Sequence, residues 1–171
     1  LGINGYQHRQ FLNRFFTGRF EGTFGAGEPF QLNPTTGDCR ICGTMASLAG
    51  LEQSRTLKNE ILEKMAVERL KMMYAVVLAL PGIPLLYAGD EKAVFNDYSY
   101  RERPEQKDDS RWVHRIKTDW KGKMLPSQKQ VNDFLKKAIK VRKHEKLLGG
   151  SEISFSDVQD RKSTRLNSSH T

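Results

Sequence analysis

Two adjacent carboxylates, Asp90 and Glu91, are the first residues in this sequence that suggest acid–base chemistry. They follow an unalternating apolar run, Ile83 to Ala88, whose length suits a strand buried on both faces. In parallel α/β folds, ligand chemistry often collects at the carboxyl end of such a strand. Neighbouring residues on a strand point to opposite faces, however, so these carboxylates cannot easily flank one scissile bond. We therefore interpret the pair as structural.

Cys39 and Cys42 form a C-x-x-C sequence. A zinc site would need two further Cys or His ligands, and the histidines do not supply them at ligand spacing. A redox dithiol would follow a strand and open a helix, whereas this pair follows a turn-rich stretch. The favoured interpretation is two ordinary thiols in a reducing compartment such as the cytosol, with no metal or cofactor.

Hydrophobic periodicity predicts the elements that position these residues. Apolar residues at three- and four-residue spacing predict helices over 6–16, over about 60–80 and from about 127 to 148. Ser127 and Gln130 suggest a capping box at the start of the third helix.

The order of helix, strand and helix fits the closing units of an α/β barrel. The expected fold class is therefore α/β. The expected domains are a loop-rich subdomain over 1–57, the last part of the barrel over 58–148, the start of a C-terminal β domain over 149–159 and a tail over 160–171.

The formal net charge of +8 raises the possibility of a basic nucleic-acid-binding module. Its strongest support is one basic helix face, which comprises Lys136, Lys137, Lys140, Arg142, Lys143 and Lys146. The same face would serve equally well as a solvated exterior, and no recognised nucleic-acid motif accompanies it. No nucleic-acid partner is expected.

The last residues of the sequence differ from the rest of the chain. Asp160 to His170 looks like the in-frame translation of a sequencing adapter, with a disordered basic tail as the other interpretation. Without this segment the net charge falls from +8 to +6, because it holds three basic residues and one acidic residue.

No run of 18 apolar residues occurs, so no membrane span is expected. The start at Leu1 is expected to be a cut inside a larger protein.

Three stretches taken together resemble the amylosucrase family of the α-amylase superfamily. They read Gly-Tyr-Gln-His-Arg-Gln-Phe-Leu-Asn-Arg-Phe-Phe over 5–16, Asn-Pro-Thr-Thr-Gly-Asp-Cys-Arg over 33–40 and Asp-Asp-Ser-Arg-Trp-Val-His-Arg over 108–115. A fourth stretch, over 82–91, matches the eighth-strand pattern of the whole superfamily. The resemblance covers residue 1 to about 155.

The resemblance implies that the fold is an incomplete TIM (β/α)8 barrel made of helix 7, strand 8 and helix 8, with the 1–57 subdomain inserted after strand 7. It also implies that the whole enzyme cleaves sucrose by a retaining double displacement. An Asp nucleophile would take glucose as a covalent intermediate, a Glu would act as acid and then base, and a second Asp would stabilise the transition state. In this family all three lie on earlier strands, before Leu1, so this chain alone is expected to hold no catalytic residue and to be inactive. Its expected partners are sucrose, an α-glucan acceptor and the missing N-terminal part of its own polypeptide.

The residues expected to bind substrate also follow from the resemblance. Arg111 matches an arginine that pairs with an aspartate elsewhere in the protein and closes the bottom of the glucose pocket. Arg40 matches one that binds the fructose ring and later the acceptor. The remaining matches, which line the acceptor track, are Arg9, Phe11, Gln31 and Asn33. Phe11 as helix core and Arg9 as a solvated charge stay open.

Two departures from the family affect acceptor preference. Ala26 stands where the family commonly has arginine, and a Lys-Ala-Val-Phe stretch over 92–95 replaces a smaller one. The alternative enzymes are a sucrose hydrolase and a trehalulose-forming isomerase of the same superfamily.

Overall fold

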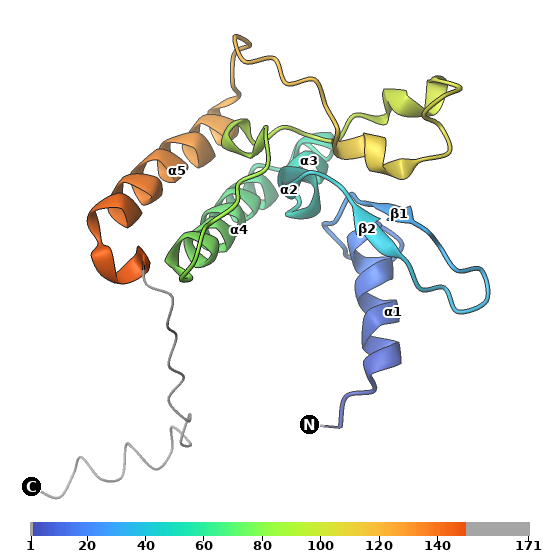
Figure 1. Ribbon diagram of the computed structural model, residues 1–171. Helices are drawn as coiled ribbons and strands as arrows, with labels where there is room; N and C mark the ends of the chain where they lie inside the picture. Colours follow the sequence, from blue (N-terminus) through green and yellow to red (C-terminus); the bar gives the residue numbers. More distant parts are fainter. Residues whose placement is uncertain (1, 150–171) are drawn as a thin grey trace, which may run out of the picture.

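The computed structural model describes residues 2–149, and this part of the chain is mainly helical (Figure 1). The α-helices are α1 (Gly5–Phe16), α2 (Met45–Leu48), α3 (Leu51–Thr56), α4 (Glu60–Ala79) and α5 (Pro126–His144). Two short strands are β1 (Glu28–Phe30) and β2 (Arg40–Cys42). Four 3-10 helices complete the set: η1 (Asp90–Lys92), η2 (Tyr98–Glu102), η3 (Ser110–His114) and η4 (Lys146–Gly149).

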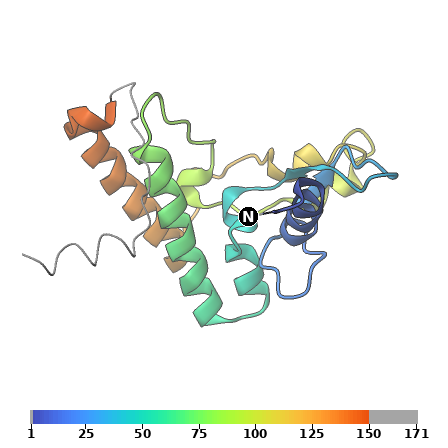
Figure 2. The same cartoon turned by 90° about the horizontal axis from the view of Figure 1, so that it is seen from below.

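The larger hydrophobic core lies between α4 and α5, which run side by side (Figures 1 and 2). Apolar side chains at helical spacing on α4 face α5 and the short helices α2 and α3. Its most buried members are Leu51, Ala66, Val67, Leu70, Tyr74, Val131 and Leu135. This packing confirms the helices that periodicity predicted at these places.

The expected fold class is wrong for this structure. No TIM barrel is formed by residues 2–149, and Ile83 to Ala88, expected as the eighth barrel strand, belongs to no sheet. A strand buried on both faces requires strands beside it and helices above and below it. The described chain provides no strand beside it, and helices cover only one of its faces. Leu86 packs against the core between α4 and α5, whereas Ile83 and Leu85 are 98% and 82% exposed.

The sheet of the described chain lies instead within 1–57, the range expected to form a loop-rich subdomain. β1 and β2 pair antiparallel, with Phe30 opposite Arg40 and Pro29 opposite Ile41. A second, smaller core covers this hairpin and joins buried Cys42 to η2 and η3. Its other members are Tyr100 and Val113, with Phe30, Tyr98 and Trp112 packed against them.

Helix α1 is present as expected and packs beside the hairpin. Its N-cap is Asn4, whose side chain accepts hydrogen bonds from the backbone of Tyr6 and Gln7. The chain then turns back against the end of α1 through Gly25 and Gly27. A Cβ atom at Gly25 would lie 2.7 Å from the Cα of Phe16, so only glycine permits this approach.

The start of α5 differs from the expected capping box. Leu125, not Ser127, precedes the helix, and the Gln128 side chain accepts a 2.9 Å hydrogen bond from the Leu125 backbone. Pro126 fills the first helical position, where no backbone donor is needed. The helix ends at His144, and η4 follows. The expected β domain over 149–159, apart from Gly149 in η4, and the adapter-like tail lie outside the described residues.

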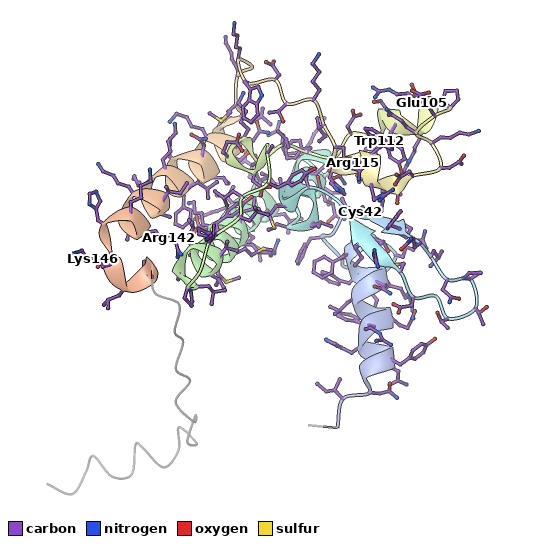
Figure 3. All side chains as sticks on the ribbon, in the orientation of Figure 1. Cys42, Glu105, Trp112, Arg115, Arg142 and Lys146 are labelled. Atoms are coloured by element: carbon purple, nitrogen blue, oxygen red, sulfur yellow. The ribbon has the colours of Figure 1, made fainter. Side chains whose placement is uncertain are left out.

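Arg142, on α5, forms hydrogen bonds with the C-terminal end of α4. Figure 3 shows it on α5 near the C-terminal end of α4, and its guanidinium donates to the carbonyls of Leu78, Leu80 and Gly82. These carbonyls lie at or after the end of α4, where the helix itself offers no donor. Arg142 therefore connects the two long helices and is not a free member of the basic face of α5.

We expect Arg142→Ala to lower the free energy of unfolding by about 1–3 kcal/mol, because it leaves carbonyls at a helix end without a donor. Lys140→Ala, an exposed change on the same helix, is expected to alter it by less than about 0.5 kcal/mol. Denaturant unfolding followed by circular dichroism measures both, and equal effects of the two variants would contradict this role of Arg142.

Candidate functional site

Arg111 lies on η3 and forms a two-pronged ion pair with Asp109. Its Nε lies 2.9 Å from Oδ1 and its Nη2 lies 2.8 Å from Oδ2, a fork that matches the planar carboxylate. The same aspartate caps η3 by accepting the Arg111 backbone N–H at 3.0 Å. The resemblance implied a distant, buried aspartate as partner. In this structure the partner is local, and the two side chains are 44% and 27% exposed.

Arg111 and Arg40 both neighbour Phe30 on the hairpin. The Arg111 guanidinium lies over the ring of Phe30, 4.7 Å from its centroid. Phe30 is directly opposite Arg40 in the β1–β2 register, so both side chains stand on the same face of the hairpin. Arg111 is thus carried to the hairpin face that also bears Arg40, some 70 residues away in sequence.

The loop between β1 and β2 carries two further expected residues, Gln31 and Asn33, both exposed. Gln31 has a φ of +53°, a left-handed conformation that a non-glycine residue adopts only when its surroundings require it. The Asn33 side-chain oxygen accepts from the backbone of Thr35 and Thr36, at 2.9 and 3.1 Å. That oxygen shapes the turn, which leaves the Asn33 amide nitrogen for a ligand.

Arg9 and Phe11 lie on different faces of α1. Arg9 faces the loop and contacts Asp38 at 3.9 Å, and Asp38 also accepts a hydrogen bond from Asn13. Phe11 instead packs against Phe20, with ring centroids 5.1 Å apart. The structure therefore brings Arg9 to the loop that carries Asn33 and places Phe11 in an aromatic cluster away from it.

The carboxylates of Asp90 and Glu91 both accept local backbone hydrogen bonds. Asp90 Oδ2 accepts from Tyr87 N and Glu91 Oε2 accepts from Gly89 N, each at 3.0 Å. They belong to η1, not to the end of a strand. Burial raises the pKa of Asp90, and the nearby Glu91 charge adds to this.

His114 and the cysteines complete the titratable groups near the hairpin. Burial lowers the pKa of His114, and its Nδ1 is buried without a hydrogen-bond partner. Sequence reasoning included His114 in a motif without giving it a role. Both cysteines are free thiols, and burial raises the pKa of each. Figure 3 shows Cys42 at the hairpin, with Trp112 and Arg115 on the neighbouring segment.

Comparison of the chain with models of known protein families finds no match. Across residues 2–149, no group of three or more His, Cys, Asp and Glu side chains could hold a metal ion. In the same part of the chain, no helix has the length and apolar character needed to cross a membrane.

The Arg111 fork lowers the pKa of Asp109 to about 2. Because this pKa lies below the ordinary value of 3.8, the ion pair contributes stability above pH 3.8 and loses it as the pH falls toward 2. In Arg111→Ala we expect the Asp109 pKa to return toward 3.8.

Arg103→Ala, which removes an exposed arginine of the same loop, should leave the Asp109 pKa unchanged. Titration of carboxyl carbon shifts by NMR measures both variants. A pKa near 2 that persisted in Arg111→Ala would show that another group lowers it.

Proposed function

We propose that this chain is part of a retaining glucosyltransferase that cleaves sucrose, transfers glucose to an α-glucan and releases fructose. The chain supplies the sugar-binding side of the site, and the catalytic carboxylates come from a part of the protein outside this sequence. The observation that carries the proposal is that Arg111 lies over Phe30, the residue paired with Arg40 across the hairpin. The three stretches that resemble the amylosucrase family, over 5–16, 33–40 and 108–115, supply the substrate class.

The chemistry of these side chains suits a neutral sugar. Hydroxyl groups accept hydrogen bonds from guanidinium N–H groups, and each arginine offers five donors in a plane. The Asp109 pair engages Nε and Nη2 of Arg111, which leaves Nη1 for a ligand. Arg40 is exposed and has no carboxylate within 4 Å among the described residues. Arg111, which the Asp109 fork holds in place, suits a tightly held sugar. Arg40, which has no carboxylate partner among the described residues, suits an exchangeable sugar.

The loop geometry adds support for the exchangeable position. Gln31 stands in a left-handed conformation beside the Phe30–Arg40 pair, and such backbone outliers concentrate at functional sites. Arg9 and the Asn33 amide extend polar groups along the same loop. We assign these groups to the outgoing acceptor chain. Phe11, in its aromatic cluster, contributes to holding α1 instead.

The chemical step would proceed by two displacements at the glucosyl carbon. A carboxylate outside this sequence attacks it while an acid protonates the departing fructose, and an acceptor hydroxyl then replaces the enzyme. In this scheme Arg111 orients the glucosyl unit and Arg40 binds first fructose and then the acceptor. The proposal also places the enzyme in a reducing compartment such as the cytoplasm, in keeping with its two free thiols.

Arg111→Ala tests the orienting role in a polypeptide that also carries the upstream coding region. We expect fructose release to fall by about a hundredfold, because a displaced sugar meets the nucleophile in the wrong geometry. Arg111→Lys should rescue poorly, since an ammonium cannot reproduce the fork. Arg103→Ala is the matched control. Parental turnover in Arg111→Ala would refute the assignment.

Arg40→Ala tests the acceptor role in the same enzyme. We expect sucrose consumption to change by less than about threefold, while the ratio of glucan to free glucose falls by about tenfold or more, because water replaces a poorly held acceptor. Chromatography of glucan, glucose and fructose gives both quantities. Arg19→Ala, an exposed arginine outside the hairpin, is the control. An unchanged product ratio in Arg40→Ala would contradict its acceptor role.

A further inference from the structure

A cavity of about 330 Å³ lies on the side of the hairpin opposite Arg40. Ile41 alternates with Arg40 along β2 and lines this cavity, so the two side chains face different environments. The wall is mostly apolar and is built from α2, the Tyr87–Val94 segment and η3. Its apolar side chains are Ile41, Met45, Leu48, Ala88 and Val94.

Two polar side chains in the wall have unused acceptor capacity. Asp90 Oδ2 accepts from Tyr87 N, and hydrogen bonding from the neighbouring Tyr74 hydroxyl lowers the pKa of the same carboxylate. A carboxylate has about four lone-pair sites, so Asp90 can still accept from a ligand. His114 Nδ1 is buried without a partner, and it accepts a hydrogen bond when the ring carries its proton on Nε2. Thr44, also in the wall, has its hydroxyl engaged with Ser47.

The Asp90 carboxylate is half-buried, and no Lys or Arg of the described chain forms an ion pair with it. The neighbouring charge is Glu91, which repels it. A carboxylate withdrawn from water without a counter-charge is costly, and a bound cation would remove that cost. His114 is compatible with a bound cation, because its lowered pKa keeps the ring uncharged near neutral pH.

We propose that this cavity binds a small organic ammonium ion, with its N–H groups donating to Asp90 and His114 Nδ1 and its apolar body against Ile41, Met45 and Leu48. The rings of Tyr87 and His114 meet edge to face, with centroids 5.9 Å apart, and form one wall for the apolar body. An ammonium has three donors and no acceptor, which matches a wall whose free side-chain groups are acceptors.

A neutral sugar fits this cavity less well than an ammonium. A monosaccharide carries several hydroxyl groups, and each loses free energy when it is buried without a hydrogen bond. Only two side-chain acceptors are free here, and the rest of the wall is mainly aliphatic. The inference does not rest on the proposed sugar chemistry of Arg40 and Arg111, and either can fail alone.

Calorimetric titration of the 171-residue chain with cyclohexylammonium, in a buffer without amines, tests the site. We expect one-to-one binding, and at least about tenfold weaker binding of uncharged cyclohexanol, because it cannot pair with the carboxylate. Asp90→Asn keeps an acceptor for the Tyr87 N–H and removes the charge, so it should weaken cyclohexylammonium by about tenfold or more.

The matched control is Glu91→Gln, which removes the same charge one residue away, outside the cavity wall, and should leave the affinity within about twofold. Ala88→Leu narrows the exposed part of the wall without altering charge and should also weaken binding. If circular dichroism shows that Asp90→Asn is unfolded, the affinity of Ala88→Leu for cyclohexylammonium becomes the deciding measurement. No binding to the parent chain, equal binding of cyclohexanol, or equal losses in Asp90→Asn and Glu91→Gln would overturn the proposal.

Discussion

The hydrogen bonds of Asn96 are the interaction on which the placement of the candidate site depends. Its side-chain oxygen accepts from Thr44 N at 2.8 Å, and its amide donates to the carbonyl of Ala26. Its backbone N–H donates to Ser47 Oγ at 2.9 Å. One residue thereby joins the chain before β1, the start of α2 and the segment that leads into η2. These polar groups are partly withdrawn from water, so leaving any of them unpaired would be costly.

This junction determines where η3 meets the hairpin. After Asn96 the chain continues through Asp97, whose backbone donates to the carbonyl of Val113 at 2.9 Å. Val113 packs into the small core with Cys42, and Arg111 is therefore carried over the ring of Phe30. The local Asp109 fork sets the direction of the Arg111 side chain. Backbone pairing, apolar packing and a charged fork thus act in sequence to place one guanidinium.

The segment that was expected to be a barrel strand shows how a correct local pattern can lead to a wrong fold. Ile83 to Tyr87 is a mainly apolar run, as the sequence indicates, yet it has no regular secondary structure and pairs with no strand in the described chain. Strand formation depends on hydrogen bonds to another segment, and an apolar run cannot specify that partner. The hairpin was missed for the related reason that three-residue strands carry too little periodicity to be recognised.

The sequence by itself determined the three main helices, the turn-rich region between α1 and α2, and the residue types able to bind a sugar. Helix formation depends on contacts three or four residues apart, which are visible in a linear pattern. Only the tertiary structure decided that Arg111 pairs with Asp109, that Phe11 turns away from Arg9, and that Asp90 and His114 share a cavity. The Asp109 pair is local, but the sequence does not show which carboxylate a flexible guanidinium selects. The position of Phe11 depends on packing against Phe20, and the cavity joins segments distant in sequence, which residue spacing does not encode.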